Sequence, residues 1–145
     1  MPDTDLAAFI RARLDEDEQE ALAASPGPWR ANAEHDEVLA VDGETVADGF
    51  ALSSEQLRAT VRHIVRHDPA RVLREIEAKR HLLHAHAREH ECLGLTGHGE
   101  HSVVDGKPWE FWENHYTDDL GPCFVLRCLA LPYADHESFR EEWRP

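Results

Sequence analysis

A run of helix-breaking residues near the start of the chain, Ser25-Pro26-Gly27-Pro28, divides the sequence into segments of different periodicity. Before this run, residues 4–23 carry apolar side chains at helical spacing: Leu6, Phe9, Ile10 and Leu14. Proline and glycine together do not permit a further helical turn, so this amphipathic helix must end there. Thr4 is its expected N-cap, with Asp5 in the first turn.

After these helix-breaking residues, the spacing of apolar residues changes from that of a helix to that of short strands. Residues 29–32, 37–41 and 45–50 read as three short strands, and Asp42-Gly43 is a hairpin turn signal between the last two. These features predict a small antiparallel meander with one side against helices.

Two further helices are predicted next. Ser53 or Ser54 can cap the first, which continues to about His67, and Asp68-Pro69 reads as the N-cap and first residue of a longer helix ending near Glu91. The apolar stripe of the first contains Leu57, Val61, Ile64 and Val65, and that of the second contains Val72, Leu73, Ile76, Leu82 and Leu83.

Residues 93–121 are rich in glycine, histidine and aromatic residues and show no clear period. A stretch of this length inside a domain is usually functional, metal-organised or disordered. Beyond it, Gly121-Pro122-Cys123 starts another helix, and a short last helix carries Phe139 and Trp143. We therefore expect an α+β fold in a single domain, 1–145, with a helix and meander in 1–52 and a helical half in 53–145.

The charge balance restricts the partners. Fifteen Lys and Arg against 29 Asp and Glu give a formal charge of −14, which opposes binding to nucleic-acid phosphates or anionic membranes. Solubility alone accounts for such a charge, but it also suits a basic protein partner or an acidic mimic of nucleic acid.

The compartment is expected to be the cytoplasm. No apolar stretch reaches the length of a membrane span, and the N-terminus lacks the basic flank and apolar run of a signal peptide. The three cysteines, Cys92, Cys123 and Cys128, form an odd set that argues against a secreted disulfide framework. In a reducing compartment they are thiols or metal ligands.

Histidines and cysteines gather in the C-terminal half, where they suggest a zinc site. Zinc takes four tetrahedral nitrogen or sulfur ligands, usually from two short clusters. The first cluster is at the end of the long helix, followed by two histidines in the glycine-rich stretch; its members are His81, His84, His86, His90, Cys92, His98 and His101. The second is Cys123, placed at the start of a helix, and the thiolate is the form of cysteine that binds zinc. A structural site is expected rather than a catalytic one, although the chain lacks a Cys-x-x-Cys pair.

Other chemistry has weaker support in the sequence. Cys123 with a neighbouring histidine could act as a nucleophile, but no family signature of such enzymes is present. Cys128 is expected to be a small buried hydrophobic residue.

Four aromatic residues lie close together in the sequence: Trp109, Phe111, Trp112 and Tyr116. They could cover the core or form an exposed anchor patch for a protein partner. There is no phosphate loop, no dinucleotide glycine fingerprint and no His-Glu-x-x-His.

Three segments resemble a family of short proteins from Streptomyces-type actinobacteria and their phages, a family of unknown function: Ser25-Pro26-Gly27-Pro28-Trp29, residues 63–80 and residues 129–143. The resemblance covers nearly the whole chain and implies a zinc site of one histidine and three cysteines. His86 and Cys123 match its positions, and Cys92 fits the first member of a cysteine pair. The second member is replaced here, by His98, His101 or His90. The resulting expected ligand set is His86, Cys92, His98 and Cys123.

The function expected from these observations is a non-enzymatic accessory or regulatory protein of phage or mobile-element type, which acts through a protein partner and holds a structural zinc ion. One alternative is a small metal-dependent hydrolase or nuclease that uses the histidine cluster, in which zinc would keep an open coordination position. The other is an acidic nucleic-acid mimic that inhibits a host enzyme.

Overall fold

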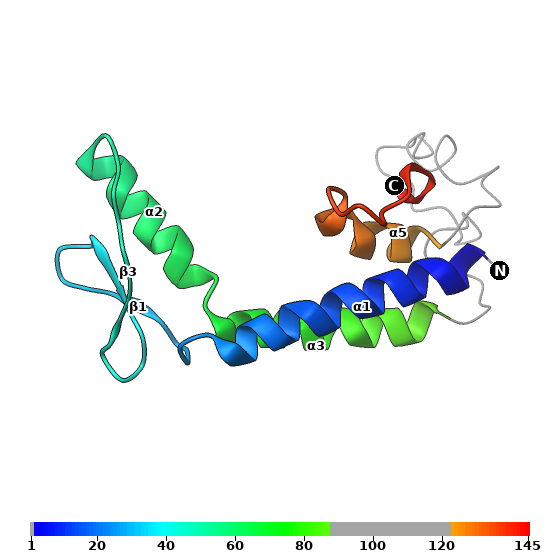
Figure 1. The fold of residues 1–145 in the computed structure, drawn as a ribbon, viewed down its shortest axis with the longest axis horizontal. Helices are drawn as coiled ribbons and strands as arrows, with labels where there is room; N and C mark the ends of the chain where they lie inside the picture. The colour runs from blue at the N-terminus through cyan, green and yellow to red at the C-terminus, as the bar shows by residue number, and fades with distance from the viewer. Residues whose placement is uncertain (1, 88–122) are drawn as a thin grey trace, which may run out of the picture. The chain divides into compact units, whose positions relative to one another are not determined.

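A computed structural model describes residues 2–87 and 123–145 of the chain, and it has an α+β fold (Figure 1). Four α-helices and a three-stranded antiparallel sheet make up most of the described residues, and two short 3-10 helices follow at the C-terminal end. In chain order the elements are α1 (Pro2–Ala23), β1 (Arg30–Ala31), β2 (Glu37–Leu39), β3 (Thr45–Asp48), α2 (Ser54–Arg66), α3 (Pro69–His86), α5 (Phe124–Ala130), η1 (Leu131–Tyr133) and η2 (Glu141–Trp143).

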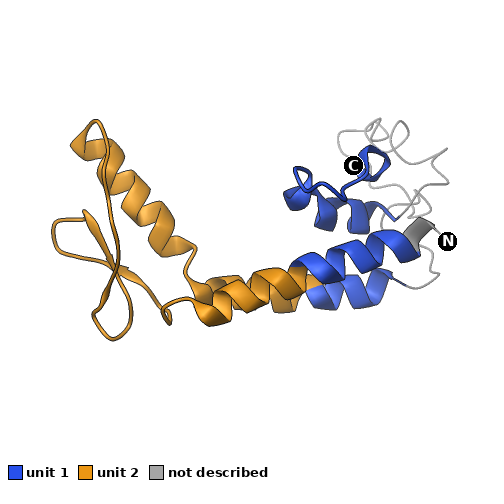
Figure 2. Cartoon of the chain, viewed as in Figure 1, with its two compact units in different colours: residues 1–13, 80–145 blue, residues 14–79 orange. Residues whose placement is uncertain are grey.

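The chain divides into two compact units, which Figure 2 distinguishes by colour. Unit 1 contains residues 1–13 and 80–145, and unit 2 contains residues 14–79. Both divisions fall inside helices, since α1 and α3 each contribute residues to both units. That residues 1–145 form a single domain stays a prediction.

The expected N-terminal helix is confirmed as α1, with one correction at its start. It begins at Pro2, because proline suits the first turn of a helix, where its missing N–H is not needed. Thr4 therefore lies inside the helix and is not its N-cap. The side chains of Leu6, Ile10 and Leu14 are fully buried, as their spacing predicts.

The predicted meander is also confirmed, with shorter strands than expected. Strand β2 pairs antiparallel with both neighbours, so that the sheet order is β1-β2-β3, and Val38 at its centre is buried. At the turn between β2 and β3, Gly43 has a φ of 90°, a conformation that favours glycine. The Asp42 carboxylate supports the turn by accepting a hydrogen bond from the Glu44 amide, 3.1 Å away.

Helix α2 begins where the sequence predicts and packs close to the residue that follows β3. Ser53 is its N-cap, and the Ser53 hydroxyl accepts a hydrogen bond from the Gln56 amide at 3.2 Å. A Cβ on Gly49 would lie 2.6 Å from Leu57 Cδ1 and 2.8 Å from Val61 Cγ2. The backbone at residue 49 therefore lies against the apolar side of α2, and a larger residue there would force its neighbours to shift.

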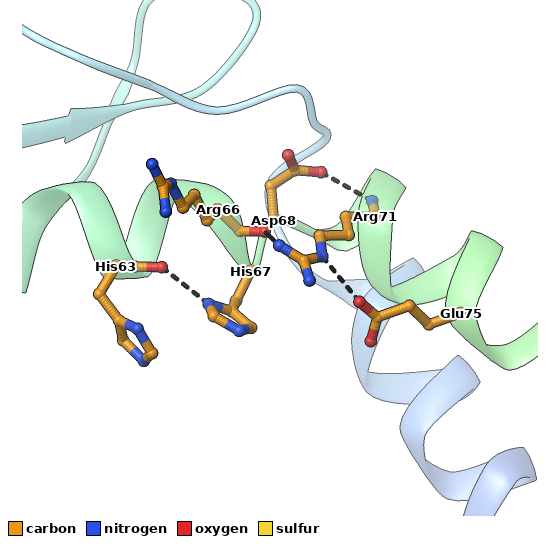
Figure 3. A network of polar contacts seen from close by, with 6 residues as sticks. All are labelled: His63, Arg66, His67, Asp68, Arg71 and Glu75. Atoms are coloured by element: carbon orange, nitrogen blue, oxygen red, sulfur yellow. Dashed lines mark hydrogen bonds and ion pairs between the residues drawn. The ribbon is translucent and has the colours of Figure 1, made fainter. Parts of the chain in front are cut away.

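The corner between α2 and α3 is held by a network of polar contacts (Figure 3). Asp68 is buried, and its Oδ1 accepts a hydrogen bond from the Arg71 amide at 2.9 Å, as expected for the N-cap before Pro69. The Arg71 side chain then joins both helices, because Nη1 donates to the Arg66 carbonyl at 3.1 Å and Nε donates to Glu75 Oε1 at 2.7 Å.

An aromatic cluster forms the core of unit 1. Phe9 of α1 lies with its ring centroid 5.1 Å from that of Trp143 and 6.1 Å from that of Phe139. Trp143 is 3% exposed. The short last helix around Trp143 is a 3-10 helix, η2. Among the elements assigned above, no helix combines the length and apolar character that a membrane crossing requires.

Two further expectations about helices were wrong. Helix α3 ends at His86, with Ala87 already outside it, so it is shorter than the predicted helix, and residues 88–91 lie outside the described residues. Leu82 was expected in the core but is 46% exposed. The buried side of α3 contains Ile76 and Leu83, seven residues apart, and Leu82 is turned about 100° from Leu83 around the helix.

Candidate metal centre

The end of α3 and the start of α5 bring a histidine and a cysteine together within unit 1. His86 is the last residue of α3, and Cys123 directly precedes α5. Although they are 37 positions apart in the sequence, Cys123 Sγ lies 3.5 Å from His86 Nδ1. Both residues are half-buried. These are the two residues that match most closely the zinc ligands implied by the resemblance.

The Cys123 side chain lies against His86 and does not cap its own helix. Cys123 occupies the N-cap position of α5, but its side chain makes no capping hydrogen bond. The α5 helix has only seven residues. The thiol is directed instead to the imidazole of His86, where a sulfur and a nitrogen can share a proton or a metal ion.

The remaining predicted ligands cannot be placed by the structure. Cys92 and His98, together with the alternatives His90 and His101, lie outside the described residues. Within ranges 2–87 and 123–145, no three His, Cys, Asp or Glu side chains are grouped so that they could hold a metal ion. The aromatic residues expected to form an anchor patch also lie outside the described residues: Trp109, Phe111, Trp112 and Tyr116.

The third cysteine corrects a prediction. Cys128 was expected to be buried in α5 but is exposed. The helix buries Leu126, Leu129 and Ala130, which share one side at a spacing of three and four residues, and Cys128 falls on another side. Partial burial of its thiol nevertheless raises the pKa of Cys128, and the positive charge of Arg127 opposes this increase. A protonated thiol on an exposed side of the helix is a poor metal ligand.

One histidine contact in unit 1 was not predicted from the sequence. His136 lies beside Phe9, with ring centroids 5.6 Å apart, and its Nδ1 accepts a hydrogen bond from the Ser138 amide at 3.0 Å. Arg13 Nη1 of α1 lies 3.1 Å from the same nitrogen. Arg13 and His136 are 123 positions apart, so no local pattern indicates their contact.

Comparisons with known proteins place the chain in a family but supply no activity. No curated protein and no solved structure matches it. A model of a family of unknown function, DUF6221, matches residues 3–145, which is nearly the whole chain. The chain therefore belongs to the DUF6221 family of unknown function.

Proposed function

We propose that this protein is a non-enzymatic accessory protein that acts by binding a protein partner, and that a structural zinc ion stabilises its unit 1. The observation that carries the zinc proposal is the 3.5 Å separation between Cys123 Sγ and His86 Nδ1. The setting we propose is the one that the resemblance implies, a phage or mobile element of an actinobacterial cell, with the protein in the cytoplasm.

The separation of the two atoms fits a shared tetrahedral zinc ion. A zinc–sulfur bond of about 2.3 Å and a zinc–nitrogen bond of about 2.05 Å, at a tetrahedral angle of about 109°, place the two ligand atoms about 3.6 Å apart. Nδ1 and Sγ are at that separation without any rearrangement of either helix. A hydrogen bond between a thiol and an imidazole has a similar length. Metal analysis therefore has to distinguish a shared zinc ion from a direct hydrogen bond.

A zinc ion at this place would stabilise the fold by joining two residues that are distant in the sequence. His86, at the end of α3, and Cys123, directly before α5, are 37 positions apart. Bringing two such positions of an unfolded chain together costs conformational entropy, and a metal ion bonded to both residues offsets this cost. We propose Cys92 and His98 as the other two ligands, with His90 and His101 as the replacements to test if His98 is not one.

The number of protein ligands decides between an accessory protein and an enzyme. Structural zinc has four protein ligands, and catalytic zinc has three ligands and a water molecule. Our proposal requires four. The sequence contains none of the catalytic motifs named above, and its charge of −14 suits a basic protein partner.

Metal analysis of protein purified without an affinity tag tests the zinc proposal. We expect about one zinc ion per chain, and we expect its loss in His86→Ala and in Cys123→Ser. His84→Ala, on an exposed position of α3, and Cys128→Ser, on an exposed position of α5, are matched controls that should retain zinc. Wild-type protein that is metal-free and still melts cooperatively would contradict the proposal.

The same pair of residues favours one second candidate, a cysteine-dependent enzyme. A thiol within reach of an imidazole is the arrangement in which histidine activates a nucleophile. The two candidates differ in thiol reactivity. An activated Cys123 would react rapidly with iodoacetamide at neutral pH, whereas a zinc-bound Cys123 would be protected until a chelator removes the metal.

A further inference from the structure

Two large apolar side chains are exposed on the connection between β3 and α2 in unit 2. Phe50 is 87% exposed and Leu52 is 101% exposed, whereas apolar side chains of this size gain stability when they are removed from water. The two residues are separated only by Ala51, and Leu52 directly precedes Ser53, the N-cap of α2. We call residues 50–52 the apolar tip.

The apolar tip is held at both ends. On one side, the Gly49 amide donates a hydrogen bond to the Asp36 carbonyl at 2.6 Å, and the Gly49 backbone lies against α2. On the other side, Ser53 caps α2, and its carbonyl accepts a hydrogen bond from the Leu57 amide at 3.0 Å. Only three residues join Gly49 to Ser53, and both of these residues are held by hydrogen bonds. Little conformational entropy is therefore lost when a partner covers Phe50 and Leu52.

The segment of sequence that contains the apolar tip, between Arg30 and Arg58, is acidic. Residues 31–57 contain seven Asp and Glu and neither Lys nor Arg. Asp48 ends β3, Glu55 is in the first turn of α2, and Glu37 pairs with Asp48 across the sheet. In the part of the chain that the structure describes, no ion pair neutralises these carboxylates or that of Asp36.

Two of these carboxylates are also held in place. The side-chain amide of Asn32 donates hydrogen bonds to Asp36 Oδ1 at 2.5 Å and to Glu37 Oε2 at 3.1 Å. The Asn32 Oδ1 atom accepts hydrogen bonds from the amides of the same two residues at 3.0 and 3.1 Å. The carboxylates of Asp36 and Glu37 are thus held by Asn32 where the connection from β1 enters β2.

We propose that Phe50 and Leu52 are the anchor residues of a docking surface for a protein with an apolar pocket and a rim of Lys and Arg. This inference rests on the proposed protein-binding function and names the surface that performs it. Apolar anchors in a central pocket supply most of the affinity of such interfaces, and charges around them steer association and set specificity. A nucleic acid or an anionic membrane would be repelled by the carboxylates. A second copy of the chain would oppose seven acidic residues with seven more.

Photo-crosslinking in the cells that naturally make the protein tests the proposal. The crosslinking residue p-benzoylphenylalanine replaces Phe50 in one variant, Val41 in a second and Leu22 in a third. Val41 is 52% exposed and belongs to the same acidic segment, and Leu22 is 68% exposed on α1. We expect position 50 to crosslink one protein that position 41 does not, through a peptide that contains apolar residues and Lys or Arg.

The purified partner then allows a quantitative test. Phe50→Ser/Leu52→Ser retains all charges and should weaken binding at least tenfold for each side chain, that is by about a hundredfold. Asp48→Asn/Glu55→Gln should slow association and reduce its dependence on salt. Because all four side chains are exposed, both variants should retain the zinc content and melting temperature of the wild type.

Several results would overturn the inference. Equal crosslinking from positions 41 and 50, crosslinking of position 50 only to a second copy of the chain, or unchanged affinity of the double serine variant each contradicts it. A protein captured only at position 22 overturns this inference and leaves the proposed protein-binding function standing. Absence of any crosslinked protein at all three positions, with zinc retained, contradicts both.

Discussion

Gly27 lies so close to the buried N-cap of α3 that a Cβ at residue 27 would be 2.7 Å from Asp68 Oδ1. We predict that Gly27→Ala displaces the Asp68 carboxylate and breaks its hydrogen bond to the Arg71 amide. Loss of an N-cap costs about 0.5–2 kcal/mol, so urea unfolding should show a decrease of about this size. In Gly27→Ala/Asp68→Ala the two losses should not add, and full additivity would contradict the account.

Removal of Trp143 should destabilise unit 1 strongly. The side chain is 3% exposed and lies against Phe9 and Phe139, so truncation leaves a cavity that the neighbouring rings can fill only in part. Trp143→Ala should reduce the free energy of unfolding by about 3–5 kcal/mol. Leu131→Ala is the control in the same C-terminal segment, because Leu131 is 44% exposed and should matter little. Equal effects of the two substitutions in thermal melts would contradict the packing described above.

The ion pair between Arg71 and Glu75 predicts a small, pH-dependent contribution to stability. The hydrogen bond from Arg71 lowers the pKa of Glu75, and the charge of Arg71 adds to this effect. A lowered folded-state pKa stabilises the protein above the unfolded value, near about 4.3, and this stabilisation is lost as the pH falls through the folded value. Because both side chains are largely exposed, Glu75→Gln should cost only about 0.5 kcal/mol at pH 7.

The dependence on pH separates this contribution from a change in packing. In chemical denaturation, the difference between wild type and Glu75→Gln should decrease as the pH is lowered from 7 through the lowered pKa of Glu75, and it should disappear once the carboxyl group is protonated in both the folded and the unfolded state. A difference of the same size throughout this pH range would show that the carboxylate charge is not its origin.

The two described cysteines should differ in reactivity toward Ellman's reagent. Burial of its thiol raises the pKa of Cys128, so the thiolate is scarce at neutral pH and its reaction should be slow and accelerate as the pH rises. Cys123 should be protected by zinc and react after a chelator is added. Cys128→Ser should remove the slow, pH-dependent phase and leave the chelator-dependent phase unchanged. A phase from Cys123 that is fast without a chelator would favour the cysteine-dependent enzyme.

Local chemistry explains which elements the sequence could predict. The caps Ser53 and Asp68 were predicted correctly because capping depends on residues within one turn of the helix start. The turn at Gly43 depends in the same way on adjacent residues. The prediction that Thr4 is the N-cap of the first helix was wrong, because Pro2 can itself occupy the first turn of α1.

The burial of individual helix residues was less predictable, since it depends on what packs against each side of the helix. Leu82 and Cys128 are apolar enough for a core, but each lies beside the buried side of its helix and not on it. The Arg13–His136 contact was missed because nothing near either residue indicates the other. The pair of His86 and Cys123 was predicted from zinc-ligand chemistry and from the family resemblance. Their spacing of 37 positions would not by itself have indicated that they lie close together.

X-ray absorption at the zinc edge, on wild-type protein purified without a tag and on Cys123→Ser, tests the central claim most directly. The account predicts four nitrogen and sulfur ligands in the wild type, with a sulfur shell at about 2.3 Å and no coordinated water. In Cys123→Ser, any zinc that remains should have one sulfur fewer. Wild-type protein that contains no zinc and is fully folded, or a zinc spectrum unchanged by Cys123→Ser, would contradict a zinc site built on Cys123 and His86.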